Sequence, residues 1–405
     1  MKYVVLIGDG MAGRPLKELG YKTCLQKART PNMDRLAAEG EAGKVRTVPK
    51  GFEPGSDVAN LSILGYDPSK YYSGRAPLEA AYQGIKLGPK DVAFRCNLVN
   101  LIFKGSKAVM NDYSAGHITT NESRALIKEI DKNLGRKDIS FYPGVSYRHL
   151  MVWRNGKEKI KCTPPHDISG RSIDNYLPKG KGAEVLQKLK NEAVGILLAN
   201  PVNKDRIKRG LPPANSVWFW GQGRKLSIPK FKDKYKLKGA LISAVDLTKG
   251  LGICAGFDVL NVKGATGYID TNYAGKANAA LKTLDKHDLV YVHVEAPDEA
   301  GHNGNIEDKI RAIEDFDSKV VGRIMKGMKR FKEYSILLMP DHATPIRAMT
   351  HTDEPVPFVI YRNNKNEKRE NRKPSSYSEY ICRMKDILVF EKGHELMDYF
   401  IQSSK

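Results

Sequence analysis

Three short apolar runs of this sequence have the composition of buried β-strands: residues 2–7, 289–294 and 335–339. Each run is followed within a few residues by carboxylate or imidazole side chains, namely Asp9, then Asp298 with His302, then Asp341 with His342. Strands that alternate with helices form a mostly parallel sheet covered on both faces. Ligands of such sheets bind beyond the carboxyl ends of the strands. The sequence therefore predicts an α/β fold with polar side chains gathered at one edge of its sheet.

Helical segments separate these runs. Apolar residues recur at helical spacing from Ile306 to Met328, which predicts one long amphipathic helix. Residues 244–255 and 273–284 are also predicted to be helical. Thr30-Pro31 and Gly40 have the residue types that begin and end a helix between them. A mostly parallel sheet flanked by helices is the architecture that this alternation predicts.

A chain of 405 residues is too long for one ordinary hydrophobic core, so two domains are expected. Residues 79–232 differ from their surroundings, with Lys/Arg-rich stretches, short alternating runs and the three tryptophans. We predict that they form a smaller α/β (α+β) domain inserted into a discontinuous domain of residues 1–78 and 233–405. The lysine-rich stretch 225–238 is interpreted as the linker that returns to the first domain.

Lysine and arginine exceed aspartate and glutamate by 67 − 46 = 21. A lysine-rich surface that aids solubility, or a field that attracts anionic ligands, would each explain this excess. The sequence contains no nucleic-acid-binding motif and no stripe of interleaved basic and aromatic residues, so we expect no nucleic-acid partner. A small phosphorylated substrate accounts for the charge equally well.

The apolar runs are far shorter than the roughly 18 residues that a membrane helix needs, and no membrane partner is expected. Residues 1–9 contain no signal-peptide cleavage site. The five cysteines are scattered without paired spacing, as in proteins of a reducing compartment, so a cytoplasmic location is predicted. The sequence gives no indication of the oligomeric state.

The side chains that follow the strands are suitable ligands for metal ions. Carboxylate and imidazole groups bind Zn²⁺ or Mn²⁺, and the absence of cysteine among them disfavours a structural zinc site. Paired ions about 3.5–4 Å apart serve phosphoryl chemistry in many enzymes. Asp9, between two glycines, could alternatively be part of an ordinary turn.

Ser56 is the candidate nucleophile. It is predicted to cap a short helix that extends to about Leu64, where its hydroxyl would lie beside the positive end of the helix dipole. An ordinary N-cap serine is the alternative. A serine hydroxyl needs a base or a metal ion to become nucleophilic at neutral pH. If the fold brings Ser56 between Asp9 and Asp341-His342, a metal ion would supply that activation.

Six phrases occur in the order typical of the alkaline phosphatase superfamily: Gly8-Asp9-Gly10, Thr30-Pro31-Asn32-Met33-Asp34, Gly55-Ser56-Asp57, Pro297-Asp298-Glu299-Ala300-Gly301-His302, Pro340-Asp341-His342 and Thr350-His351-Thr352. Within that superfamily the chain resembles the archaeal-type cofactor-independent phosphoglycerate mutases, which also occur in bacteria. The resemblance covers nearly the whole chain and includes its length and the position of the inserted domain. It implies an alkaline-phosphatase-like fold.

The resemblance also implies a mechanism. Asp9, Ser56, Asp341 and His342 would hold one metal ion, and Asp298, His302 and His351 the other. Ser56 would take the phosphoryl group from one phosphoglycerate and return it to the other hydroxyl of the retained glycerate. This reaction interconverts 2- and 3-phosphoglycerate in glycolysis and gluconeogenesis. The expected cofactors are two divalent ions, Mn²⁺ first and Zn²⁺, Co²⁺ or Mg²⁺ as alternatives, without bisphosphoglycerate.

Candidate substrate contacts are His117, Arg148, Asp167, Arg171, Arg224 and Lys249. An arginine fork matches the paired oxygens of carboxylate and phosphate, although each arginine could equally be a solvated surface charge. The longer cofactor-independent mutases carry Asn-Ser-Glu at the nucleophile, whereas this chain has Gly55-Ser56-Asp57. That departure limits the transfer of second-domain contacts from the longer enzymes.

Two kinds of alternative function remain open: another enzyme that uses the same metal site, and a binding protein that has no use for it. A related phosphatase, or a kinase of the proposed homoserine kinase type, would use the same ligands on another substrate. A sulfatase is disfavoured because the sequence lacks a Cys/Ser-x-Pro-x-Arg motif. A basic nucleic-acid-binding protein with a degenerate core would bind its partner with steep salt dependence, but the complete ligand set argues against it.

Overall fold

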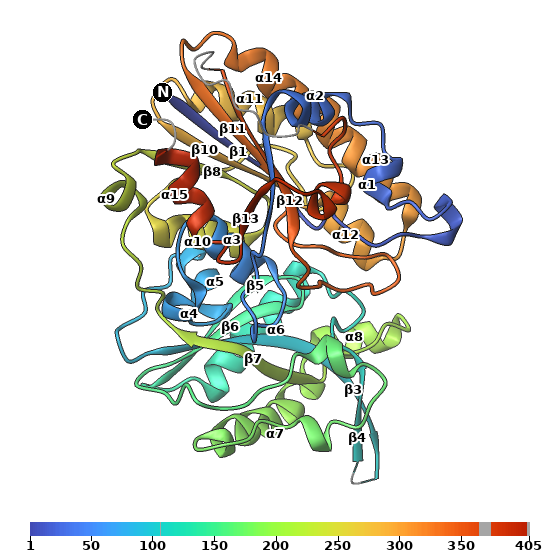
Figure 1. Ribbon diagram of the computed structural model, residues 1–405. Coiled ribbons are helices and arrows are strands. Elements are labelled where there is room, and N and C mark those ends of the chain that lie inside the picture. Colours follow the sequence, from blue (N-terminus) through green and yellow to red (C-terminus); the bar gives the residue numbers. More distant parts are fainter. Residues whose placement is uncertain (106, 364–373, 403–405) are drawn as a thin grey trace. The chain divides into compact units, whose positions relative to one another are not determined.

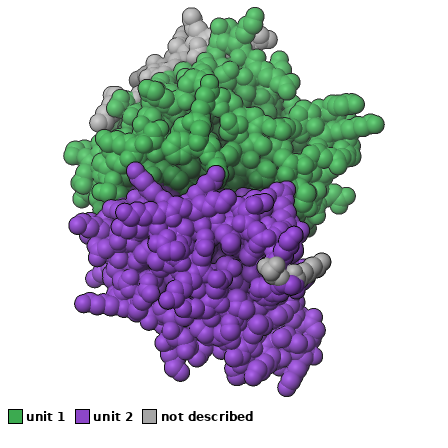
Figure 2. Space-filling view, turned by 90° about the horizontal axis from the view of Figure 1, so that it is seen from below, with its two compact units in different colours: residues 1–72, 227–405 green, residues 73–226 purple. Residues whose placement is uncertain are grey.

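The computed structural model describes residues 1–105, 107–363 and 374–402. The chain divides into two compact units. Unit 1 comprises residues 1–72 and 227–405, and unit 2 comprises residues 73–226 (Figure 2). Whether the functional domains have the limits predicted from the sequence, 1–78 with 233–405 and 79–232, stays a prediction.

Unit 1 is built on an eight-stranded sheet (Figure 1). Its strands are β1 (Lys2–Gly8), β2 (Glu41–Val45), β8 (Gly239–Ile242), β9 (Asp258–Leu260), β10 (Leu289–Val294), β11 (Tyr334–Met339), β12 (Val356–Arg362) and β13 (Leu388–Phe390). They are arranged in the order β13-β2-β12-β11-β1-β10-β8-β9. All neighbours are parallel except β12, which is antiparallel to both β11 and β2. The predicted mostly parallel sheet is confirmed.

The three apolar runs form the centre of this sheet. β1 lies between β10 and β11, and every residue of β10 and β11 is buried. Near their carboxyl ends the strands are in register, because Ile7 pairs with both His293 and Met339. The residues that follow each strand therefore emerge at one edge of the sheet, as expected for parallel strands.

The helices of unit 1 lie on both faces of the sheet (Figure 1). They are α1 (Cys24–Lys27), α2 (Pro31–Glu39), α3 (Ser56–Ile63), α4 (Pro68–Tyr71), α9 (Phe231–Tyr235), α10 (Asp246–Ala255), α11 (Tyr273–Thr283), α12 (Ala296–His302), α13 (Ile306–Asp315), α14 (Gly322–Met328) and α15 (Glu395–Gln402). Residues of α2, α11, α13 and α14 share one hydrophobic core with β1, β10 and β11. Their apolar faces cover the sheet and keep water away from its hydrogen bonds.

Local predictions for unit 1 had mixed outcomes. The helix between Thr30 and Gly40 is confirmed, with Pro31 as its first residue. The predicted long helix is interrupted by a π-helical turn, residues 316–321, between α13 and α14. The predicted linker 225–238 contains α9, because Phe231 and Tyr235 are buried and anchor it to the core of unit 1.

Unit 2 is an α+β structure around an antiparallel sheet. Its strands are β3 (Val92–Lys104), β4 (Lys107–Asp112), β5 (Ile139–Val145), β6 (Arg148–Trp153) and β7 (Ser216–Arg224). The long strand β3 pairs with β4, β6 and β7. Its helices are α5 (Ala76–Tyr82), α6 (Thr120–Leu134), α7 (Ala183–Ala199) and α8 (Pro201–Lys208). Over the described residues of both units, no helix has the length and apolarity needed to cross a membrane.

Candidate active site at the edge of the parallel sheet

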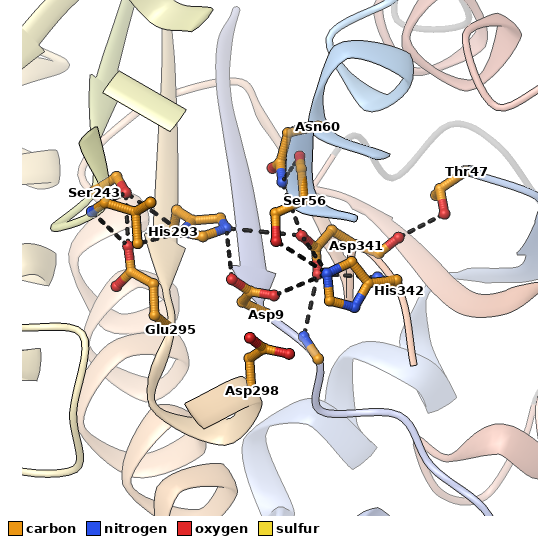
Figure 3. Close-up of polar contacts among 12 residues, drawn as sticks. Asp9, Thr47, Ser56, Asn60, Ser243, His293, Glu295, Asp298, Asp341 and His342 are labelled. Atoms are coloured by element: carbon orange, nitrogen blue, oxygen red, sulfur yellow. Dashed lines mark hydrogen bonds and ion pairs between the residues drawn. The ribbon is translucent and has the colours of Figure 1, made fainter. Parts of the chain in front are cut away.

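Ser56 and three predicted metal ligands lie together at the edge of the unit 1 sheet (Figure 3). The ring nitrogen Nε2 of His342 is 3.0 Å from the Ser56 hydroxyl oxygen. The same nitrogen is 3.4 Å from Asp9 Oδ1 and 3.5 Å from Asp341 Oδ2. β1 positions Asp9, β11 positions Asp341 and His342, and the start of α3 positions Ser56. These elements bring the two ends of the chain together around one hydroxyl group.

The prediction that Ser56 caps α3 is wrong. The N-cap residue is Gly55, and Ser56 is the first residue of the helix. The Ser56 hydroxyl is close to His342 Nε2 and makes no capping hydrogen bond to the backbone. Its place in the first turn of α3 still leaves it beside backbone N–H groups that have no partner within the helix.

Asn60, which sequence reasoning missed, links the candidate nucleophile Ser56 to Asp341, a predicted metal ligand. Its side-chain amide donates to the carbonyl oxygen of Ser56 and to Asp341 Oδ2, each at 2.8 Å. The Tyr291 hydroxyl in turn donates to the amide oxygen of Asn60. Thr47 donates its hydroxyl to the backbone carbonyl of Asp341 (Figure 3). These hydrogen bonds hold the backbone of Ser56 and both the backbone and the carboxylate of Asp341 in place.

Asp298, His302 and His351 form a second cluster. His302 Nε2 is 2.9 Å from His351 Nε2 and 3.2 Å from Asp298 Oδ2, and His351 Nε2 is 3.6 Å from Asp298 Oδ1. The other ring nitrogen of each histidine faces a backbone carbonyl, of Met349 for His302 and of Pro54 for His351. Since a carbonyl only accepts, both Nδ1 atoms donate a hydrogen, and both Nε2 atoms face Asp298.

His342 lies between the two clusters. Its ring centroid is 4.2 Å from that of His351, and one ligand atom from each of Asp298, His342 and His351 lies within 4.8 Å of the others. A second close group joins Asp9 and Asp341 with His293, which sequence reasoning did not identify. The division of the ligands between two ions stays a prediction.

Burial shapes the electrostatics of the cluster around Asp9. Burial and the neighbouring carboxylates of Asp341 and Asp298 raise the pKa of Asp9 well above its usual value. Burial also lowers the pKa of His342 to about 4, which keeps its imidazole neutral at pH 7. Burial opposes ionisation of Asp341, but His342 and His293 outweigh it and hold the pKa of Asp341 below its ordinary range. Close buried acids of this kind need a positive charge among them.

Two atoms in this cluster show that its donors fit a divalent cation. Asp9 Oδ1 and His293 Nε2 are both buried, and neither has a hydrogen-bond partner among the described residues. Carboxylate oxygen and imidazole nitrogen are ligands that Zn²⁺ and Mn²⁺ accept. The residues present therefore fit a cation bound at the Asp9 carboxylate, whose Oδ2 lies 3.3 Å from His293 Nε2.

Gly10 allows the two clusters to approach each other. Its backbone φ is +59°, and its N–H donates to Asp341 Oδ1 at 3.1 Å. A Cβ atom at this position would collide with Asp298 Oδ1 and would lie 2.6 Å from Thr344 Oγ1. Lys309 donates to the carbonyl oxygens of Gly10 and Thr344, at 2.7 and 2.6 Å, and so ties the two loops together.

Two predicted substrate contacts of unit 2, His117 and Arg148, lie against one aromatic side chain. The ring of His117 is 6.4 Å from that of Tyr147, and the Arg148 guanidinium lies 5.7 Å from the same ring. Tyr113 contacts Tyr147 at 5.7 Å and His166 at 6.1 Å. Both His117 and Arg148 are exposed, so they are accessible to a ligand.

The other predicted contacts have different neighbours. Asp167 is exposed and lies 3.6 Å from His166, while Arg171 donates to the Tyr176 hydroxyl at 3.4 Å. Arg224 forms an ion pair with Glu158 at 3.1 Å, and Lys249 is buried in α10 of unit 1. Arg95, which sequence reasoning missed, lies with its guanidinium 4.5 Å from the ring of Trp220. The roles of Asp167, Arg171, Arg224 and Lys249 toward a substrate stay predictions.

Comparison with known proteins connects this geometry to a family. The family model of the 2,3-bisphosphoglycerate-independent phosphoglycerate mutase matches residues 37–203. A probable 2,3-bisphosphoglycerate-independent phosphoglycerate mutase of Geobacter sulfurreducens is 56% identical over 99% of this chain and 100% of its own length. The enzyme of that name from Methanosarcina mazei is 55% identical over 91% of this chain and 92% of its own.

Solved structures agree with the sequence relatives. A Pyrococcus horikoshii protein superposes with a TM-score of 0.82 at 30% identity, over 100% of this chain and 98% of its own. The cofactor-independent phosphoglycerate mutase of Thermoplasma acidophilum gives a TM-score of 0.65 at 28% identity over the full length of both chains. With relatives this similar over nearly its whole length, the chain belongs to the family of 2,3-bisphosphoglycerate-independent phosphoglycerate mutases.

Proposed function

We propose that this protein interconverts 2-phosphoglycerate and 3-phosphoglycerate without bisphosphoglycerate, through a phosphoserine at Ser56. The observation that carries the proposal is the position of the Ser56 hydroxyl, 3.0 Å from His342 Nε2 and beside a cluster of buried carboxylates. A hydroxyl in this setting can serve as a nucleophile, which an ordinary helix cap cannot.

The proposed metal ligands are those predicted from the sequence. Asp9, Ser56, Asp341 and His342 would hold one divalent ion, and Asp298, His302 and His351 the other, with Mn²⁺ favoured over Zn²⁺, Co²⁺ or Mg²⁺. Such ions neutralise phosphoryl oxygens and lower the pKa of a bound hydroxyl. The mixed oxygen and nitrogen donors support this assignment.

The chain's own groups then carry the transfer. Ser56 Oγ forms a bond to phosphorus while the bond from phosphorus to the substrate oxygen breaks, and the proton lost by Ser56 balances the one gained by that oxygen. The retained glycerate then presents its other hydroxyl to the phosphoserine, and the reverse exchange regenerates Ser56. Backbone N–H groups in the first turn of α3 would stabilise the phosphoryl oxygens.

We propose that unit 2 supplies substrate contacts through His117, Arg148, Asp167, Arg171 and Arg224, with Lys249 contributed by unit 1. Guanidinium groups recognise carboxylate and phosphate through paired hydrogen bonds. A phosphoserine open to water would hydrolyse, so a mutase must exclude water during transfer. We further propose a cytoplasmic location, supported by five cysteines that form no disulfide.

The test is a mutase assay on purified protein loaded with Mn²⁺. We expect 3-phosphoglycerate to be converted to 2-phosphoglycerate with no added bisphosphoglycerate, as followed by ³¹P NMR. Free ¹³C-labelled glycerate added to the reaction should not enter the product, because the glycerate is retained. Absence of conversion with Mn²⁺, Zn²⁺, Co²⁺ and Mg²⁺ would contradict the proposal. Release of inorganic phosphate alone would indicate a phosphatase, and ATP-dependent phosphorylation of homoserine would indicate a kinase.

A further inference from the structure

We propose that His293 is an additional ligand of the ion at Asp9 and Asp341, and that Glu295 holds its ring in the ligating orientation. This inference rests on the two-metal site of the proposed function. It adds a ligand, and a group of positioning residues behind it, that the sequence did not indicate.

His293 reaches the site from the strand next to β1. It lies near the end of β10, opposite Ile7 of β1, and its side chain is fully buried. Its Nε2 atom is 3.3 Å from Asp9 Oδ2 and 3.9 Å from Asp341 Oδ2 (Figure 3). Two ligand atoms bound tetrahedrally at about 2.0–2.1 Å from one ion lie about 3.4 Å apart. The spacing of the three side chains therefore suits a shared cation.

The other side of the imidazole ring determines which nitrogen carries the hydrogen. His293 Nδ1 lies 3.0 Å from Glu295 Oε1. That oxygen also accepts from the hydroxyl of Ser243 at 2.7 Å and from the backbone N–H groups of Ala244 and Val245, at 3.0 and 3.1 Å. Surrounded by donors, Glu295 acts as an acceptor. His293 Nδ1 therefore donates its hydrogen to Glu295, and Nε2 is left to face the carboxylates.

Lys276 fixes Glu295 in turn. The Lys276 ammonium is fully buried and lies 2.9 Å from Glu295 Oε2. It also donates to the backbone carbonyl of His293 at 2.9 Å, so one side chain holds both the carboxylate and the strand that carries the histidine. A carboxylate that orients a metal-bound histidine is the usual arrangement around protein metal ions. A buried ion pair adds little net stability by itself, so a positioning role accounts for its presence better than a structural one.

His293 differs from His149, another buried histidine with an unpaired ring nitrogen, because carboxylates face the free nitrogen of His293. A buried imidazole is expected to have both nitrogens satisfied. His293 Nε2 has no hydrogen-bond partner among the described residues, and neither has the adjacent Asp9 Oδ1. His293 Nε2 faces Asp9 Oδ2, and the other oxygen of the same carboxylate faces His342. These donor atoms are of metal-ligand type, and a cation shared by His293 and Asp9 fits them.

Metal binding by variants of the full-length protein tests the proposal. Wild type, His293→Gln and Glu295→Gln are titrated with Mn²⁺ by isothermal calorimetry, with bound metal counted by elemental analysis after dialysis. We expect wild type to bind two ions. Each variant should bind one of them at least tenfold more weakly. Loss of a residue that orients a metal ligand costs roughly 10–100-fold in affinity, and loss of the ligand itself should cost no less. His394→Gln, a change in a half-buried histidine outside the cluster, is the matched control and should bind both ions normally.

The outcomes separate this inference from the proposed function. Unchanged affinities for both ions in His293→Gln would overturn the inference even if mutase activity fell. If the wild-type protein bound no divalent ion, that result would instead contradict the proposed two-metal site.

A crystal structure of the unmodified protein with Zn²⁺ covers the case in which a variant does not fold. Anomalous density at about 2.0–2.1 Å from His293 Nε2 would support ligation. An ion bound by Asp9 and Asp341 but beyond hydrogen-bond distance of Nε2 would refute it.

Discussion

The two ligand clusters of unit 1 differ in how the protein surrounds them. The inner cluster (Asp9, His293, Asp341 and His342) has no side chain more than 4% exposed. In the outer cluster (Asp298, His302 and His351), the side chains of His302 and His351 are 32% and 16% exposed. Asn60, Glu295 and Lys276 fix the inner ligands, whereas both outer histidines are oriented by loop carbonyls.

This difference suggests separate tasks for the two clusters. Rigid, water-free surroundings keep reacting groups in one geometry, and Ser56 adjoins the inner cluster. A cluster with partly exposed histidines can exchange its ion and admit a phosphoryl group. The contrast between a fixed inner site and an exchangeable outer site leads to the following predictions.

Replacing Ser56, the proposed nucleophile, should have the largest effect. Ser56→Ala should lower mutase activity by at least about 10³-fold, because no other hydroxyl occupies its place, while Mn²⁺ binding at the outer cluster persists. Steady-state kinetics and calorimetry measure the two effects. Ser62→Ala, in the same helix, is the control and should remain active. Substantial activity in Ser56→Ala would show that the nucleophile lies elsewhere.

Chelation should abolish activity in two stages. With excess EDTA, the outer ion should leave first because its ligands are partly exposed, and the inner ion should leave at least about tenfold more slowly. Rapid-quench sampling with elemental analysis follows the release of each ion. Simultaneous loss of both ions would contradict the contrast between the clusters.

Weakening the outer cluster should be reversible. His302→Gln should lower the apparent affinity for Mn²⁺ roughly 10–100-fold, and excess Mn²⁺ should restore most of the activity. The measurement is activity as a function of Mn²⁺ concentration. A loss of activity that saturating Mn²⁺ does not restore would mean that His302 does more than hold an ion.

Removing the inner scaffold should have a moderate effect. Asn60→Ala deletes the amide that joins Ser56 to Asp341, so we expect kcat to fall about tenfold with KM for 3-phosphoglycerate little changed. A parallel Thr47→Val variant, which lacks only the hydroxyl that donates to the Asp341 backbone carbonyl, should lose less. Equal kcat values for Asn60→Ala and wild type would show that Asn60 does not position the reacting groups.

A buried histidine of unit 2 shows what happens without nearby acids. Burial and the charge of Arg148 lower the pKa of His149 to about 3, against about 6.5 in an unfolded chain. Between these values the unfolded state binds the extra proton. The free energy of unfolding should therefore fall as pH drops from about 6.5 toward 3, by up to about 1.4 kcal/mol per pH unit.

Chemical denaturation at several pH values tests this slope. His149→Gln should flatten it, while His166→Gln, a change in an exposed histidine, should leave it unchanged. An equal slope in wild type and His149→Gln would assign the pH dependence to other groups.

The sequence predicted the sheet because its central strands are unbroken apolar runs, and it predicted the candidate ligands because they follow those runs in recognisable phrases. It misplaced Ser56 by one helical position, as the N-cap instead of the first residue of the helix. The reason is that the Ser56 hydroxyl contacts His342, which is 286 positions away, and not a nearby backbone N–H group. The π-helical turn within residues 306–328 has no distinct periodicity. His293 and Asn60 were missed because their significance depends on neighbours that only the folded chain supplies.

Gly10 affects how closely the inner and outer clusters approach each other. Because this residue lies between Asp341 and Asp298 with no side chain, the separation of the two clusters is set by the thickness of a bare peptide backbone. An alanine there would place its Cβ atom against Asp298 and push that side chain away from the inner cluster. Paired ions are useful only at a narrow range of separations, about 3.5–4 Å. The lack of a side chain at Gly10 thus helps to set the distance between the two clusters. A larger residue would change that distance even though every candidate ligand would still be present in the sequence.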